Sequence, residues 1–291
     1  MRPVVFEAGG GVVLRGIAQG TDADGAPLLL VHGLASNARM WAGTARELDA
    51  LGHPSVSVDL RGHGTSDKPD GGYDFPTMVE DLVRVLSALA AEHGERWRRP
   101  VVAGQSMGGN LVVELAASHP GAVAAVAGVD GGMIDLPAHF PAWADCEREL
   151  APPDLTHRTP DELRAMIRAG SPDWPEEGID AMMACFGVSD EGTVRPHLTR
   201  ERHMRLLREL WERPPARRLA HLTVPMLLLP AEGGGSVAFT ADKRRDVQHA
   251  LDTLARGRAH WFSPADHDIH AQHPRQLAEV LHDAIADGFL A

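Results

Sequence analysis

The chain has 291 residues, of which 44% are hydrophobic and 23% charged, values ordinary for a soluble globular protein with one large domain and an insertion. Its net charge is −12, with Lys68 and Lys243 as its two lysines, which argues against nucleic acid or an anionic membrane surface as a partner. No stretch approaches 18 apolar residues and the amino terminus lacks the apolar core of a signal peptide. We therefore expect a cytoplasmic protein with no membrane span; its oligomeric state stays open.

The cysteines and clustered histidines give no sign of a metal or cofactor site. Cys146 and Cys185 have no metal-ligand spacing, and reduced thiols are expected, although a single bridge between them stays open. His267, His270 and His273 are spaced by three residues, but no acid or thiol cluster accompanies them. We expect no metal and no cofactor.

Strand and helix patterns alternate through the first part of the chain. A hairpin is predicted over residues 4–6 and 12–18, followed by buried strands from short apolar runs. The predicted strands are 28–31, 55–58, 100–103 and 123–129. The predicted helices between them are 40–51, 76–93 and 110–119. This order predicts a mostly parallel sheet with helices on both faces.

The alternation stops between residues 133 and 218. Helices are predicted at 159–169, which opens with the capping box Thr159–Glu162, at 179–186 and at 199–212, with a small hairpin within 187–197. Strands return at 224–229 and 259–262, with helices at 241–254 and 274–289. We therefore expect a core domain of residues 1–132 and 219–291 and a helical cap, or lid, of residues 133–218.

The most informative motif is Gly104-Gln105-Ser106-Met107-Gly108, placed between a predicted strand and a predicted helix. A serine on such a strand–turn–helix element projects from a strained turn and is a candidate nucleophile. Small residues are needed on either side because neighbouring backbone comes close. The N–H of Met107, at the start of the helix, points towards developing negative charge.

Three further motifs follow predicted strands: His32-Gly33, the loop from Asp59 to Ser66, and Asp266-His267-Asp268 before the last helix. Together with the Gly104–Gly108 turn they make the chain similar to the α/β-hydrolase family over nearly its whole length. The resemblance implies an eight-stranded sheet with a cap inserted after the sixth strand. It also implies a catalytic triad in the chain order Ser, acid, His.

On this resemblance, Ser106 is the nucleophile and His267 the base, with His270 and His273 as rivals. The commonest family pattern places the acid after the seventh strand, where this chain has Glu232 followed by glycines. Some members place it after the sixth strand, where Asp130 lies, so we assign Asp130 as the acid. Glu232 is the runner-up, and Asp135 and Asp266 remain further alternatives.

The oxyanion hole is expected from the backbone N–H groups of Leu34 and Met107. His32, Arg61 and His63 are interpreted as structural residues that hold their loops. Candidate substrate-lining residues are Trp41, Met133, Trp143 and Met182.

These residues predict a serine hydrolase that cleaves a small carboxylic ester, lactone or thioester through an acyl-serine. Relatives that use an aspartate nucleophile are disfavoured by Ser106, and the sole tyrosine, Tyr73, lies outside the predicted cap. A carbon–carbon bond hydrolase with the same triad, or a ligand-binding protein of this fold without activity, stays open.

Overall fold

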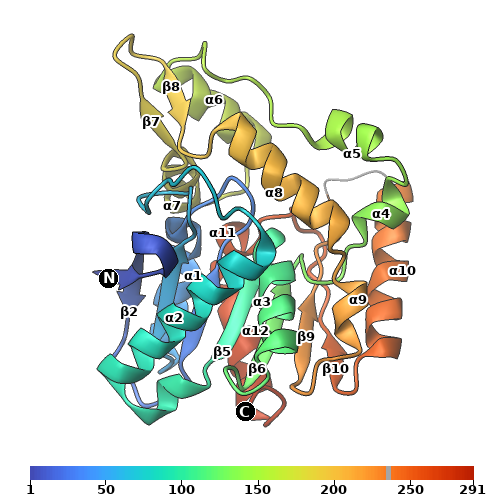
Figure 1. Cartoon of the computed structure of the whole chain (residues 1–291). Coiled ribbons are helices and arrows are strands. Elements are labelled where there is room, and N and C mark those ends of the chain that lie inside the picture. The colour runs from blue at the N-terminus through green and yellow to red at the C-terminus, as the bar shows by residue number, and fades with distance from the viewer. Residues whose placement is uncertain (234–236) are drawn as a thin grey trace.

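A single eight-stranded sheet forms the centre of the protein (Figure 1). The computed structural model describes residues 1–233 and 237–291, except for the side chains of residues 237–239. The glycines that follow Glu232 after the seventh predicted strand therefore lie partly outside the described residues. The strand order is β1-β2-β4-β3-β5-β6-β9-β10. Strand β2 is antiparallel to β1 and β4, and the other neighbours pair in parallel. The strands are β1 Arg2–Glu7, β2 Val13–Gln19, β3 Leu28–Val31, β4 Ser55–Asp59, β5 Val101–Gln105, β6 Ala125–Val129, β9 Met226–Leu229 and β10 Gly257–Ala259.

The central strands are apolar on both faces because helices cover both. In β3, Leu28 and Leu30 pack in the layer of α1 and α12, whereas Leu29 and Val31 pack in the layer of α2 and α3. Because both faces of the strand are buried, every residue of the run is hydrophobic, instead of every second one. The covering helices are α1 Ala42–Ala50, α2 Phe75–His93, α3 Met107–Ser118, α10 Val237–Thr253 and α12 Pro274–Ala286. The predicted α/β fold class is confirmed.

The segment between β6 and β9, for which we expect a cap, lies above the sheet in Figure 1. The capping box of Thr159 and Glu162 is present, and the small predicted hairpin forms as β7 and β8. Three short helices, α4, α5 and α9, were not predicted. The elements are α4 Leu136–His139, α5 Trp143–Leu150, α6 Pro160–Gly170, α7 Glu176–Met183, β7 Phe186–Val188, β8 Val194–Pro196, α8 Arg200–Glu212 and α9 Ala216–Leu219.

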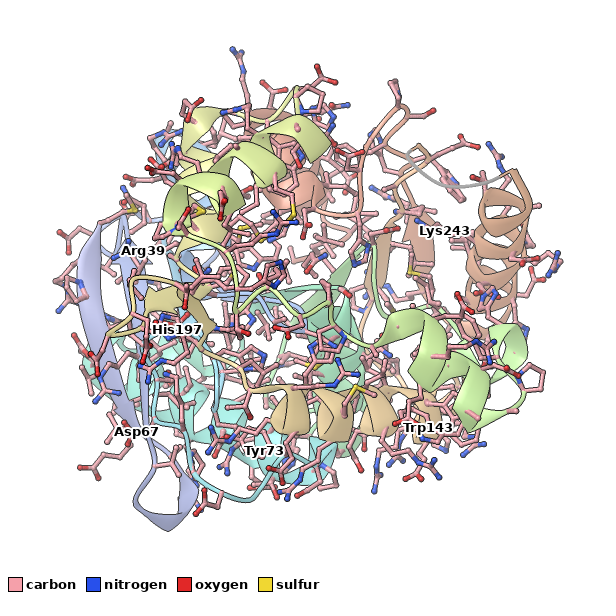
Figure 2. The ribbon with its side chains drawn as sticks, turned by 90° about the horizontal axis from the view of Figure 1, so that it is seen from above. Arg39, Asp67, Tyr73, Trp143, His197 and Lys243 are labelled. Atoms are coloured by element: carbon pink, nitrogen blue, oxygen red, sulfur yellow. The ribbon has the colours of Figure 1, made fainter. Side chains whose placement is uncertain are left out.

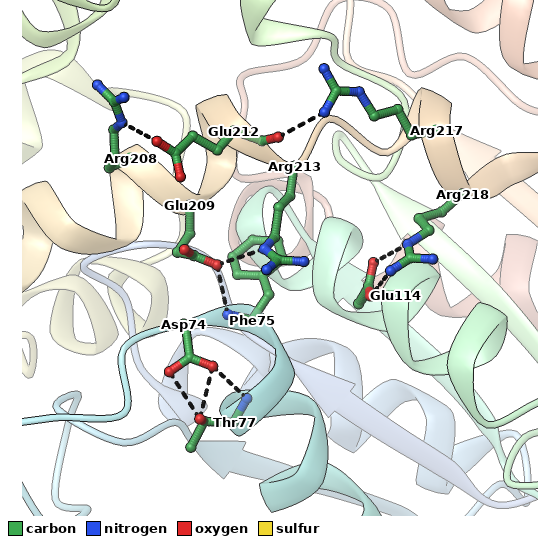
Figure 3. Close-up of polar contacts among 10 residues, drawn as sticks. All are labelled: Asp74, Phe75, Thr77, Glu114, Arg208, Glu209, Glu212, Arg213, Arg217 and Arg218. Atoms are coloured by element: carbon green, nitrogen blue, oxygen red, sulfur yellow. Dashed lines mark hydrogen bonds and ion pairs between the residues drawn. The ribbon is translucent and has the colours of Figure 1, made fainter.

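Polar contacts join the end of this segment to the sheet-covering helices (Figure 3). Arg218 on α9 forms a two-pronged ion pair with Glu114 on α3, with both N–O distances 2.7 Å. Glu209 on α8 accepts a hydrogen bond from the N–H of Phe75, the first residue of α2, at 3.0 Å. Helix α8 is thus held in a fixed position over the end of the sheet. Among the helices of the described residues, none has the length and apolar character required to cross a bilayer.

Candidate active site

Ser106 sits in a strained turn between β5 and α3. Its backbone has φ 52° and ψ −119°, a left-handed conformation that L-residues rarely adopt. A Cβ on Gly104 would come within 2.2 Å of the Gly108 carbonyl oxygen, and one on Gly108 within 2.4 Å of the Val31 oxygen. Both glycines are therefore required by close backbone approach, as the motif predicts.

The turn after β6 packs directly beneath the serine. The Ser106 N–H donates to the carbonyl of Val129 at 3.0 Å, and a Cβ on Gly131 would lie 2.3 Å from the Ser106 carbonyl oxygen. Asn110 accepts the Gly132 N–H at 3.0 Å and fixes the same turn. This packing places Asp130, between Val129 and Gly131, next to the nucleophile turn.

His267 and Asp130 form a direct hydrogen bond. Nδ1 of His267 donates to Oδ2 of Asp130 at 2.7 Å. In the neutral imidazole this leaves Nε2 as the basic nitrogen. The rival histidines are placed differently: His270 is fully buried against Trp41, and His273 precedes Pro274 at the start of α12.

The pair is electrostatically coupled. Desolvation disfavours the charged imidazolium, but the His267 side chain is half exposed, and the hydrogen bond to Asp130 together with the charge of Asp130 raises the pKa of His267 above its ordinary value. Burial also opposes ionisation of Asp130, yet contacts with His267 and Lys243 lower the pKa of its carboxyl. Asp130 is therefore a carboxylate at neutral pH.

The other candidate acids have different partners. Glu232 forms an ion pair with Arg244, and Asp135 caps α4 by accepting the N–H of Ala138 at 3.2 Å. Asp266 accepts the indole N–H of Trp174 at 3.2 Å. Of the four carboxylates considered, Asp130 is the one hydrogen-bonded to His267.

The loop that carries Leu34 is held by two buried histidines. His32 donates through Nδ1 to the Gly33 carbonyl at 2.7 Å and accepts the Leu60 N–H through Nε2 at 3.0 Å. His63 accepts the Ala35 N–H at 3.3 Å. Burial lowers the pKa of both imidazoles, so they act as neutral hydrogen-bonding groups.

Ser106, Asp130 and His267 open onto one pocket of about 320 Å³. Leu34 and Met107, whose N–H groups we expect to form the oxyanion hole, line the same pocket. Its remaining wall is mostly apolar and comes from α4, α5, α8 and the turns that follow β6. These residues are Asn110, Gly131, Ile134, Leu136, His139, Phe140, Leu150, His203, Leu207 and Leu210.

Comparison with known proteins gives the family of the chain. A family model described as "Alpha/beta hydrolase family" matches residues 28–280. The chain belongs to the α/β-hydrolase family. The turn that carries Ser106, the loop that carries His267 and the residues that line the pocket all lie within the matched part of the chain.

Several α/β-hydrolase relatives carry names of their own. The chain is 33% identical to the AB hydrolase superfamily protein YisY of Bacillus subtilis over 51% of this chain and 50% of that protein. It is 28% identical to Esterase Rv0045c of Mycobacterium tuberculosis over 87% of this chain and 80% of the relative. The first three curated relatives are matched over half of their length or less.

Among solved structures, that of E-2-(acetamidomethylene)succinate hydrolase superposes with a TM-score of 0.76 at 20% identity, over 98% of this chain and 100% of that one. At this identity the likeness concerns the fold alone.

The four substrate-lining residues expected from sequence do not line this α/β-hydrolase pocket. Trp41 is fully buried and stacks on His270, with ring centroids 4.6 Å apart, and Met133 is buried in the main core. Trp143 packs against Trp211 in the position labelled in Figure 2, and Met182 packs with the Trp174 cluster. These four side chains pack between elements because large apolar side chains fill such layers before they line a cavity.

Sequence reasoning also missed residues that the fold brings to the site. The liners on α4 and α5 lacked any periodic signal because each helix is too short to show one. Lys243 stood out as one of two lysines, but its contact with Asp130 depends on how α10 packs. Within residues 1–233 and 237–291, no group of three or more metal-binding side chains is close enough to hold an ion.

Proposed function

We propose that the protein is a serine hydrolase that cleaves a carboxylic ester, lactone or thioester through an acyl-serine intermediate. In this proposal Ser106 is the nucleophile, His267 the base and Asp130 the acid. The observation that supports it most strongly is the 2.7 Å hydrogen bond between His267 Nδ1 and Asp130 Oδ2 in the pocket onto which the strained Ser106 opens.

The reaction follows from these roles. Nε2 of His267 takes the proton of the Ser106 hydroxyl as its oxygen attacks the substrate carbonyl carbon. The N–H groups of Leu34 and Met107 stabilise the resulting oxyanion. Collapse breaks the bond to the alcohol or thiol, which leaves with the proton from His267. Water then attacks the acyl-serine with His267 as base, which releases the acid and restores Ser106.

The pocket favours an uncharged acyl group. Its wall is built mainly from aliphatic side chains and Phe140, and none of the described residues that line it is Arg or Lys. His203 is neutral at pH 7 because burial lowers its pKa to about 4, and His139 already pairs with Asp246 at 2.7 Å. A carboxylate on the acyl chain, such as that of the succinate compound named in the structural match, would be desolvated here without a cationic side chain to pair with.

A matched pair of esters tests reaction and specificity together. Purified protein is assayed on 4-nitrophenyl esters from acetyl to dodecanoyl and on the 4-nitrophenyl monoester of succinate, which has the same carbon number as butanoyl. We expect turnover of the neutral esters, at least tenfold lower kcat/KM for the succinyl ester, and loss of turnover in Ser106→Ala. Turnover retained by Ser106→Ala would contradict the proposed nucleophile.

If none of the neutral esters is turned over, the proposed cleavage of a carboxylic ester is contradicted. Lactones, thioesters and carbon–carbon substrates are then the next candidates, ahead of a purely ligand-binding role. If the succinyl ester is preferred, the mechanism stands but the proposed apolar specificity is wrong.

A further inference from the structure

Lys243 is a buried lysine in direct contact with Asp130. Its Nζ lies 2.8 Å from Oδ1 and 2.9 Å from Oδ2 of the carboxylate, and it donates to the carbonyl of Ala231 at 2.9 Å. The side chains of Lys243 and Asp130 are 8% and 1% exposed, so solvent screens their interaction poorly. Figure 2 shows Lys243 on the α10 side of the molecule, far from Arg39 and His197.

The carboxylate of Asp130 is therefore shared between two partners. Oδ2 accepts from both His267 and Lys243, and Oδ1 accepts from Lys243 and from the N–H of Ala231 at 2.9 Å. This network fixes the plane of the carboxylate. It also means that His267 faces a charge already compensated by an ammonium group.

Building on the proposed function, we propose that Lys243 is a positioning residue that orients Asp130 and weakens proton binding by His267. The charge count gives the reason. With Lys243 present, the trio of Asp130, His267 and Lys243 is neutral when the imidazole is unprotonated and carries a net charge of +1 when it is protonated. Without the lysine the corresponding charges are −1 and 0. Asp130 and Lys243 are buried whereas the His267 side chain is half exposed, so the ammonium charge fixed beside the carboxylate opposes a second positive charge on the imidazole and favours the free base.

Other charged groups near His267 and Asp130 also change the pKa of His267. Asp130 and Asp268 raise the pKa of His267, whereas the charge of Lys243 lowers it. Asp268 is itself surrounded by His267, Asp130 and Asp266, and burial raises the pKa of its carboxyl. Other titratable groups of the described residues in these elements are His270 on α11 (Ile269–Gln272), His139 on α4 with its α10 partners Asp242 and Asp246, and the ion pair of Glu232 with Arg244.

Two uncharged replacements test the proposal. Lys243→Met retains most of the apolar stem, and Lys243→Gln also keeps an N–H donor for the Ala231 carbonyl; melting curves show whether each variant is folded at the assay temperature. For an ester that the parent hydrolyses, we expect the acidic limb of kcat/KM against pH to move up by about one pH unit in both variants, with a plateau within a few-fold of the parent. Lys243→Arg, which keeps the charge, should leave the limb near that of the parent.

Arg275→Met supplies the matched control for net charge. Arg275 is exposed on α12 and pairs with Glu279, so its removal changes the total charge without touching the trio. Its pH profile should match that of the parent. An unmoved limb in Lys243→Met and Lys243→Gln, or an equal shift in Arg275→Met, would overturn the proposal. A loss of activity that is uniform across pH, with the acidic limb unmoved, would likewise overturn it, because Lys243 would then have no effect on proton binding by His267.

A second readout does not need turnover. The low-field proton NMR resonance of the His267–Asp130 hydrogen bond, assigned by its loss in His267→Gln, reports protonation of the imidazole directly. Its titration midpoint should rise in the two uncharged variants, and an unchanged midpoint would refute the role of Lys243. If the parent hydrolyses no ester, lactone or thioester, the proposed function fails while this titration still decides the proposal about Lys243.

Discussion

Asp130 orients the proposed base His267 and also contributes to the stability of the fold. It is almost fully buried and holds Lys243 and His267 at once. Breaking one side of a buried ion pair leaves an uncompensated charge, which typically costs about 3–5 kcal/mol. A substitution at Asp130 therefore affects both stability and catalysis, and the two effects must be separated.

Asp130→Asn should lower kcat by about 10⁴-fold, because the imidazole loses the acceptor that fixes its tautomer. It should also lower the melting temperature, because the Lys243 ammonium stays buried without its carboxylate. The double variant Asp130→Asn, Lys243→Met should regain part of that stability and none of the activity. Glu232→Gln, which removes a charge paired with Arg244, is the matched control and should stay within a few-fold of the parent. A larger loss in Glu232→Gln than in Asp130→Asn would mean that the acid is misassigned.

At the scale of elements, helix α8 offers one buried side chain that lines the pocket and a neighbouring one that only packs in the core. Leu206 and Leu207 are adjacent and both buried, but Leu207 lines the pocket and Leu206 faces only the core. Either one replaced by alanine should cost about 2–5 kcal/mol of unfolding free energy.

Leu207→Ala should also raise the ratio of dodecanoyl to butanoyl ester turnover several-fold, because it lengthens the apolar pocket. Leu206→Ala should leave that ratio unchanged. Kinetics on the ester series, with melting curves alongside, make the comparison. If the two variants shift the ratio equally, the pocket wall is not where we place it.

Elements with strong local signals were predictable from sequence. The apolar runs became β3, β5 and β9, and the capping box opened α6, because burial and hydrogen bonding act there over a few residues. The proximity of Asp130 to the nucleophile could be inferred because one helix and one strand return the chain to the same sheet edge. The residues of the pocket wall could not be inferred from the sequence, since they depend on how α4, α5 and α8 pack over that edge. The side chains expected there, Trp41 and Met182 among them, were used for packing instead.

At the scale of the whole molecule, buried neutral histidines link stability to pH. Burial lowers the pKa of His203 to about 4 and of His270 to about 3, and lowers those of His32 and His63. Unfolded, these groups bind protons near pH 6.5, so acid favours the unfolded chain. His267 acts in the opposite sense: its raised pKa adds stability below pH 6.5 that is lost as pH rises through the folded value.

Six imidazoles have a lowered pKa, those of His53 and His197 included, against one that is raised, so stability should fall as pH drops from 7.0 to 5.5, by about 1 kcal/mol for each imidazole that stays neutral over this range. Urea unfolding at the two pH values measures this. His203→Gln should reduce the difference by about 1 kcal/mol, since one such group is removed. Equal or greater stability at pH 5.5 would show that the histidines are not buried in neutral form.

The most direct test of the account is covalent labelling with an alkyl fluorophosphonate, which reacts with a serine hydroxyl activated by a neighbouring base. Intact-mass and peptide analysis should find one adduct per chain, on the peptide that contains Ser106. The adduct should be absent in Ser106→Ala and form far more slowly in His267→Ala. An unlabelled parent protein, or a label that persists in Ser106→Ala, would contradict the assignment of Ser106 as an activated nucleophile.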